Sequence, residues 1–251
     1  MNAAPLTLLP DWRAPAQVRV LSTTRLGGCS RAPFDSMNLG LHTGDAPDAV
    51  LANRARLRRD HALPAEPVWL RQVHGVHVVH AEWATDAEPA DGCWTSRRGR
   101  PIAIMTADCL PVVLCDHHGS RVAVVHAGWR GLAAGVLEAA LEVFDADQRL
   151  HAWLGPAIGP QAFEVGAEVR EAFVSQDAQQ AAAFVPSSGS DRFHADLYAL
   201  ARRVLRRSCS IECSGGEWCT LSRADLFHSH RRDGSASGRM ATVAWLADDG
   251  A

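Results

Sequence analysis

Short runs of apolar residues, each long enough for a single β-strand, restrict the fold of this chain more than any other feature. Six of them, several rich in Val and Ile, lie at residues 76–79, 101–105, 111–114, 121–125, 152–154 and 240–245. Because runs of this length and composition are typical of buried strands, we expect a core built from β-sheets. None of them approaches the roughly 20 apolar residues that a membrane-spanning helix requires.

Helical periodicity accompanies these strands. It is clearest at Leu197, Leu200, Ala201, Val204 and Leu205, which are spaced to form one apolar stripe. Further helices are expected over residues 129–143, 49–59 and 167–174. Since helices and strands do not alternate in regular βαβ units, the pattern predicts an α+β fold with mixed β-sheets in layers.

Size and charge narrow the class of protein. With 251 residues, 47% of them hydrophobic, the chain is expected to form one domain. A net charge of −3 gives no general electrostatic footprint for nucleic acid or for an anionic membrane. The N-terminus has no basic segment ahead of an apolar one, and the seven cysteines form no dense disulfide framework. We therefore expect a cytoplasmic protein with reduced thiols.

Three side chains able to bind a metal stand where an apolar strand begins, ends or is interrupted. They are His74 in RQVHG, Cys109 in TADCLPV and His126 in VVHAGWRG. Burying polar groups without partners costs a few kcal/mol each, and a shared metal ion would supply a common partner. Two imidazoles and a thiolate suit Zn²⁺ or copper, and three ligands leave a fourth position open for catalysis.

Spacing alone does not settle this site. The three residues are separated by 35 and 17 positions, which is no compact ligand motif, and the chain contains 12 His. Taken by themselves, His74 and His126 are better explained as core histidines that bond to backbone carbonyls.

A series of motifs in one order resembles a known family. The motifs are TTRLGG, NLGLHTGD, RQVHG, ADG, TADCLPV, HAGWRGLAAGV, LGPAIGP, FEVG, HRRDG and GRMA. In this order they resemble the laccase-domain, or polyphenol-oxidase-like, family of bacterial purine nucleoside phosphorylases. The resemblance extends from about Val18 to Trp245, so we expect residues 1–17 to be a peripheral N-terminal segment of a single-domain protein.

The resemblance implies a fold, a metal and an activity. The fold would be a layered α/β/β/α arrangement, and His74, Cys109 and His126 would be zinc ligands. The implied reaction is cleavage of purine nucleosides by phosphate, with adenosine, inosine, guanosine and methylthioadenosine as substrates, accompanied by deamination of adenosine.

Four further residues are candidates for the chemistry. Arg25, in a turn rich in Gly, and Arg130, near an expected helix start, are candidate phosphate contacts; each could instead pair with Asp45 or Asp91 to brace a turn. Asp108 is a candidate proton relay, or it orients a ligand as residues around metals usually do.

Asn38 is a candidate contact to ribose or base, although Asn also commonly closes loops. Three alternative functions stay open. They are copper-dependent oxidation of phenols, hydrolysis of peptidoglycan precursors, and a non-enzymatic domain that holds zinc and binds a partner.

Overall fold

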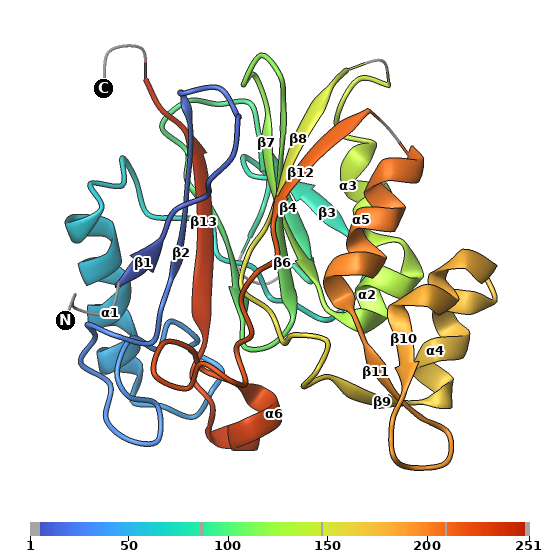
Figure 1. Ribbon diagram of the computed structural model, residues 1–251. Helices are drawn as coiled ribbons and strands as arrows, with labels where there is room; N and C mark the ends of the chain where they lie inside the picture. The colour runs from blue at the N-terminus through green and yellow to red at the C-terminus, as the bar shows by residue number, and fades with distance from the viewer. Residues whose placement is uncertain (1–5, 86–87, 147, 209, 249–251) are drawn as a thin grey trace.

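Two β-sheets lie face to face in the centre of the molecule, and helices cover their outer faces (Figure 1). The structure is a computed structural model that describes residues 6–85, 88–146, 148–208 and 210–248. The layers are one helix, two sheets and a further group of helices. This order confirms the expected α+β fold with an α/β/β/α arrangement.

The smaller of the central sheets has four antiparallel strands. Their order is β1 (Thr7–Leu8), β2 (Val18–Thr23), β13 (Met240–Leu246) and β5 (Ile102–Thr106). The outer face of this sheet packs against α1 (Pro47–Asp60), which buries Val50 and Leu57. Of the expected peripheral segment, residues 1–5 lie outside the described residues, and β1 forms the edge of the sheet.

The larger sheet has six strands of mixed direction. Their order is β12 (Ile211–Gly215), β8 (Leu150–Leu154), β6 (Leu110–Asp116), β7 (Val122–Ala127), β4 (Gly92–Thr95) and β3 (Val78–His80). All seven residues of β6 are buried. Successive side chains point to opposite faces, so Val113 and Cys115 pack between the sheets while Val112 and Leu114 pack under the helices.

Three helices cover the outer face of the six-stranded sheet: α2 (Trp129–Ala134), α3 (Val136–Leu141) and α5 (Leu197–Ser208). The predicted apolar stripe of α5 is confirmed, since all five of its residues are buried. The single helix expected over residues 129–143 is wrong. Gly135 adopts a left-handed conformation with φ +102° and divides that segment into α2 and α3.

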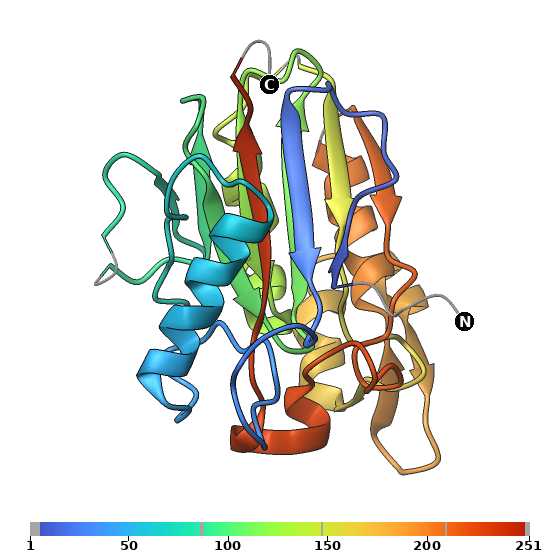
Figure 2. The ribbon, with the colours of Figure 1, turned by 90° about the vertical axis from the view of Figure 1, so that its left-hand side faces the viewer.

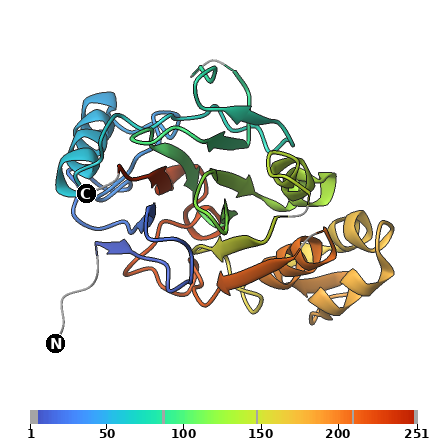
Figure 3. The ribbon, with the colours of Figure 1, turned by 90° about the horizontal axis from the view of Figure 1, so that it is seen from above.

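A third, antiparallel sheet lies at one end of the layers (Figure 3). Its strands are, in order across the sheet, β10 (Phe184–Pro186), β11 (Arg192–Ala195) and β9 (Glu164–Gly166). Between β9 and β10 the chain forms α4 (Ala167–Val174) and a 3₁₀-helix (Ala178–Ala183). The last elements before β13 are α6 (His230–Asp233) and a 3₁₀-turn (Gly234–Ala236), which lie below the end of the four-stranded sheet (Figure 2).

All six strands expected from apolar runs are present, as are helices near the expected positions. The sequence did not indicate β2, β4, β12 or the third sheet. No described helix combines the length and the apolar character needed to cross a bilayer.

Candidate metal centre and its two cavities

The hairpin of β6 and β7 brings two of the candidate ligands together. The strands pair antiparallel, with Leu110 opposite Ala127 and Pro111 opposite His126. The start of β6 therefore lies beside the end of β7. Cys109 directly precedes β6, so it lies at the same end of the six-stranded sheet as His126.

The carboxylate of Asp91 positions both histidines. Asp91 is fully buried, and its Oδ1 accepts a hydrogen bond from Nδ1 of His126 at 2.7 Å and one from the backbone N–H of His74 at 2.9 Å. Its Oδ2 accepts from the backbone N–H groups of Val73 and Gly75, at 3.1 and 2.7 Å. Burial opposes ionisation, but the hydrogen bonds from His126 and Gly75 outweigh it and lower the pKa of Asp91.

Asp91 also explains an unusual backbone conformation. His74 has φ +60°, in the left-handed region that residues other than glycine seldom occupy. The three consecutive N–H groups of residues 73–75 all point at the Asp91 carboxylate, and this grip holds the turn that directs the His74 imidazole toward Cys109.

The donor atoms of His74, Cys109 and His126 lie within 4.8 Å of one another. Sγ of Cys109 is 3.8 Å from Nε2 of His74, and the two imidazole rings meet edge to face with centroids 4.8 Å apart. Burial would raise the pKa of the Cys109 thiol, but the charge of His126 and hydrogen bonds from both imidazoles lower it to about 6. The cluster thus favours the thiolate, the form that binds metals.

Gly128 gives the cluster the room it needs. A Cβ at this position would lie 3.0 Å from Sγ of Cys109, 3.0 Å from Cδ2 of His74 and 3.6 Å from Cε1 of His126. A side chain here would crowd Cys109 and His74, while its contact with His126 would be an ordinary van der Waals contact.

These features fit a metal ion. Zn–S and Zn–N bonds are about 2.3 and 2.0–2.1 Å long, so atoms 3.8 Å apart, such as Sγ and Nε2, can bind one ion. Since Nδ1 of His126 is engaged by Asp91, Nε2 remains to bind, which is the usual way in which a carboxylate fixes a metal-binding imidazole. The three side chains leave a fourth coordination position for a substrate or water.

Two cavities meet at the cluster. The first, the polar cavity, has a volume of about 290 Å³ and is lined by the three candidate ligands with His42, Gln72, Met105, Thr106, Ala107, His230 and Arg239. The second, the aromatic cavity, has about 300 Å³ and is lined by His74 and Cys109 with Ala107, Asp108, Trp129, Arg130, Ile158, Phe163, Leu197, His230 and Arg231. Small-molecule sites usually enclose roughly 300–1,000 Å³, so the candidate metal centre lies between two compartments at the lower end of that range.

Asp108 ties the Cys109 segment to the start of α6. Its Oδ1 accepts from Oγ1 of Thr220 at 2.6 Å, and its Oδ2 accepts from Oγ of Ser229 at 2.9 Å and from the backbone N–H of Arg231 at 2.6 Å. These contacts go to none of the three candidate ligands. The carboxylate instead sets where α6 begins, and with it the position of His230 in the lining of both cavities.

Arg130 is exposed in the aromatic cavity, where its guanidinium lies 4.5 Å from the ring centre of its neighbour Trp129. Arg25 lines neither cavity. It forms an ion pair with Asp35 at 3.3 Å, and it donates to the carbonyls of Asp35 and Ala224 at 2.9 and 3.2 Å. Its charge therefore braces two chain segments, with Asp35 as the partner rather than Asp45 or Asp91.

Asn38 is fully buried and also closes a loop. Its Nδ2 donates to Oγ1 of Thr43 and Oδ2 of Asp45, and its Oδ1 accepts from the backbone N–H groups of Gly40 and Arg239. It lines neither cavity, and it affects the polar cavity only by positioning the backbone of Arg239.

Sequence reasoning missed Asp91, Arg239 and His230 as parts of the site. All three stand inside motifs that carry the family resemblance: ADG for Asp91, HRRDG for His230 and GRMA for Arg239. Asp91 directly precedes β4, a strand that the sequence did not indicate, so its place in the ADG motif was the signal that could have marked it. No signal in the sequence places Arg239 or His230 beside Cys109, because their segment is more than 100 residues away.

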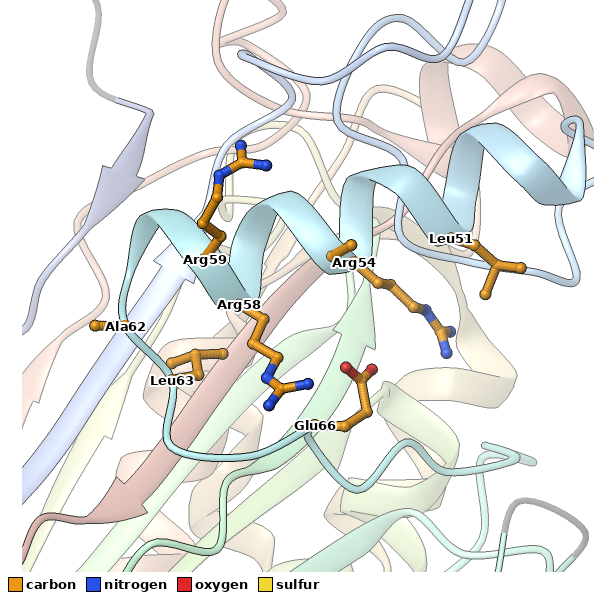
Figure 4. A pocket seen from close by; sticks show the side chains of 8 residues that line it. Leu51, Arg54, Arg58, Arg59, Ala62, Leu63 and Glu66 are labelled. Carbon is orange, nitrogen blue, oxygen red and sulfur yellow. The ribbon is translucent and has the colours of Figure 1, made fainter.

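A larger hollow of about 580 Å³ lies along α1 (Figure 4). Arg54, Arg58, Arg59 and Glu66 are among its lining residues. It shares none of them with the two cavities at the cluster, and it holds none of the three candidate ligands. Its size therefore does not make it part of the site.

Comparison with known proteins agrees with this arrangement. The sequence model of a family described as "Multi-copper polyphenol oxidoreductase laccase" matches residues 19–247. A purine nucleoside phosphorylase from Pseudomonas aeruginosa is 52% identical, over 96% of this chain and 98% of its own. The purine nucleoside phosphorylase YfiH of Escherichia coli is 48% identical, over 95% of this chain and 98% of its own.

Solved structures show the same fold. A crystal structure of a Neisseria meningitidis protein from the family called DUF152 is 45% identical, covers 97% of this chain and all of its own, and superposes with a TM-score of 0.91. YlmD from Geobacillus stearothermophilus is 28% identical, with 93% of each chain covered and a TM-score of 0.79.

Proposed function

Because the chain belongs to the multi-copper polyphenol oxidoreductase laccase family, whose relatives at 48–52% identity are named purine nucleoside phosphorylases, we propose that it is a zinc-dependent purine nucleoside phosphorylase. The observation that carries the proposal is the His74, Cys109 and His126 cluster, which lies where the two cavities meet. Three donors with an open fourth position suit catalysis better than a structural site, which is usually closed by four.

In the proposed reaction an oxygen of hydrogen phosphate attacks the anomeric carbon of the nucleoside. The bond from that carbon to the purine nitrogen breaks, and its electron pair leaves with the base. The proton of hydrogen phosphate ends on the purine, so the products are the free base and ribose 1-phosphate. The site must hold an anion beside the sugar and stabilise the charge that develops on the leaving base.

The residues of this chain divide that work. His74, Cys109 and His126 would hold the zinc ion, which when bound supplies a Lewis acid, and Asp91 keeps His126 in the orientation that exposes Nε2. Trp129 and Phe163 offer aromatic surface to a purine. Adenosine, inosine, guanosine and methylthioadenosine are the proposed substrates.

We propose adenosine deamination as a second activity of the same site. It replaces the amino group at C6 of the purine with oxygen from water and releases ammonia. Because phosphate takes no part in it, the two activities can be separated by leaving phosphate out.

The test is product analysis with the purified protein, its metal content measured, incubated with adenosine with and without phosphate. We expect adenine and ribose 1-phosphate only with phosphate, and inosine in both cases. Cys109→Ala should give neither product.

Cys115→Ala is the matched control. It removes a buried thiol near the far end of β6, the strand that Cys109 directly precedes. Burial raises the pKa of this thiol to about 12, and the variant should retain both activities. If the metal-loaded wild type forms no purine product, the proposed function is wrong.

A further inference from the structure

The polar cavity contains a cation, Arg239, that the fold holds in place without a direct ion pair to any carboxylate of the described residues. We propose that Arg239 is the residue that binds phosphate, so that phosphate enters through the polar cavity while the purine base occupies the aromatic cavity. This inference rests on the proposed function and adds to it an anion site and a direction for the substrate.

The backbone and stem of Arg239 are fixed before any ligand arrives. Its backbone N–H donates to Oδ1 of Asn38 at 2.9 Å, and its carbonyl accepts from the N–H of Leu39 at 3.0 Å. A Cβ on Gly40 would lie 2.8 Å from Cγ of Arg239. Gly40 therefore makes the space in which the arginine stem lies.

The guanidinium is only half engaged. Nη1 donates to the carbonyls of Ser237 and Gly238 at 2.7 and 3.0 Å. Nε and Nη2 have no hydrogen-bond partner among the residues that the structure describes. These two nitrogens form one edge of the guanidinium, and such an edge binds two phosphate oxygens at once.

The surroundings favour an anion. Arg239 forms no ion pair with a carboxylate of the described part of the chain. Burial lowers the pKa of its guanidinium, and the charges of Cys109 and Asp108 offset this only in part. The pKa of His42, which lines the same cavity, is lowered by burial and then by the charges of Arg239 and Arg54. Removing a cation from water is costly when no carboxylate pairs with it directly, and a bound phosphate would offset more of that cost.

The other cavity suits the base. Phe163, Ile158 and Leu197 are buried and give it apolar walls, and Trp129 adds a second ring. Arg130 and Arg231 in this cavity lie over those rings, 4.5 Å from the centre of Trp129 and 5.4 Å from that of Phe163. A purine ring stacks readily on aromatic and guanidinium planes of this kind.

The experiment measures binding of inorganic phosphate to the metal-loaded protein by calorimetry, and separately the KM for phosphate with inosine. Arg239→Gln keeps the stem against Gly40 but removes the charge. Loss of a charged hydrogen-bonding pair corresponds to a roughly 10- to 100-fold weaker interaction, so we expect phosphate affinity to fall and the KM to rise by that factor. Adenosine deamination, which needs no phosphate, should fall less than phosphorolysis does.

Three further variants make the result decisive. Gly40→Ala should also raise the KM for phosphate, because it displaces the arginine stem, and Arg58→Gln on α1 should change nothing. Arg130→Gln tests the alternative phosphate contact. Loss of phosphate binding in Arg130→Gln with binding retained in Arg239→Gln would overturn the inference.

Failure of the inference and failure of the proposed function have different signatures. If the wild type converts nucleosides and Arg239→Gln leaves the KM for phosphate unchanged, the inference is wrong and the function stands. If no nucleoside is converted but phosphate binding still depends on Arg239, the anion site stands and the function is wrong.

Discussion

His126 and Asp91 are joined by a 2.7 Å hydrogen bond between Nδ1 and a carboxylate that is fully buried. The same carboxylate accepts three backbone N–H groups from residues 73–75. One side chain thus sets both the ring orientation of His126 and the turn that carries His74.

Asp91→Asn should weaken metal binding about 10- to 100-fold, the usual effect of losing a residue that orients a metal ligand. The amide N–H groups would face the N–H groups of residues 73–75 and of His126, which also donate. Because donors cannot pair with donors, the turn that carries His74 loosens. Zinc affinity can be measured by competition with a chromophoric chelator.

Asp116→Asn is a matched control for this experiment. Asp116 is equally buried, and it accepts hydrogen bonds from the backbone N–H groups of His118, Ser120 and Arg121 in the turn between β6 and β7. Its substitution should lower stability and leave zinc affinity unchanged. Equal loss of zinc in both variants would mean that Asp91 acts through general stability alone.

Cys109→Ala and His126→Ala should each lose metal and turnover while the fold persists. A chain of this length buries enough apolar surface to fold without zinc. Circular dichroism and metal analysis of the purified variants test this, and unfolded variants would show that the metal is needed for the fold.

Gly128→Ala should reduce zinc affinity without removing any ligand. The added Cβ would approach Sγ of Cys109 and Cδ2 of His74 to 3.0 Å, which forces the ligands apart. Gly135→Ala serves as a comparison, since its strain is one of backbone conformation and lies away from the cluster. A Gly128→Ala protein with unchanged zinc affinity would show that the cluster adapts freely.

Asp108→Asn should lower the free energy of unfolding by about 1–3 kcal/mol, because it weakens hydrogen bonds to buried partners. If Asp108 acts by orienting α6, the pH profile of turnover keeps its shape in this variant. A profile that loses one limb while stability stays constant would instead indicate a proton relay.

His228→Phe should make stability less sensitive to acid. His228 is fully buried with neither ring nitrogen hydrogen-bonded within the described structure, and burial, followed by the charges of Arg25 and Arg239, lowers its pKa to about 3. Between pH 6.5 and 3 the unfolded chain takes up a proton that the folded chain does not, so stability falls as the pH falls. From pH 7 to 5 this amounts to about 2 kcal/mol.

Urea unfolding at pH 7 and pH 5 measures this difference. Wild type should lose about 2 kcal/mol more than His228→Phe over that interval. A ring of similar shape is tolerated because Gly238, whose Cβ would lie 2.6 Å from the imidazole, leaves the space open. Parallel losses in the two proteins would mean that His228 does not titrate on unfolding.

The central strands could be predicted because burial on both faces leaves a continuous apolar run, as in β6. Strand β2, with Arg19 and Ser22 among apolar residues, lacks that signal, and the third sheet is built from short strands with charged residues such as Glu164 and Arg192. Gly135 divides the expected long helix through its backbone conformation, which apolar periodicity does not reveal.

The site was predictable in part for the same kind of reason. His74, Cys109 and His126 adjoin apolar strands, so a polar residue there stands out. Arg239 and Asp91 act through contacts between segments far apart in the chain, and only the folded sheets bring them to Cys109. Arg25 and Asn38 stand in equally suggestive motifs, yet their polar groups are engaged by neighbouring loop residues and by the backbone of Ala224 and Arg239, and neither lines the two cavities.

The register of β6 and β7 makes assembly of the candidate metal centre depend on folding. Along the chain His74 and Cys109 lie 35 positions apart, and Cys109 and His126 lie 17 positions apart. The unfolded chain therefore does not hold the three ligands close enough to bind one ion. Only the native pairing brings them together, and an ion that binds the native chain alone stabilises it by about 2.7 kcal/mol at a free concentration 100 times its Kd. The concentration of free metal would then change the free energy of unfolding as well as the fraction of chains that carry the ion.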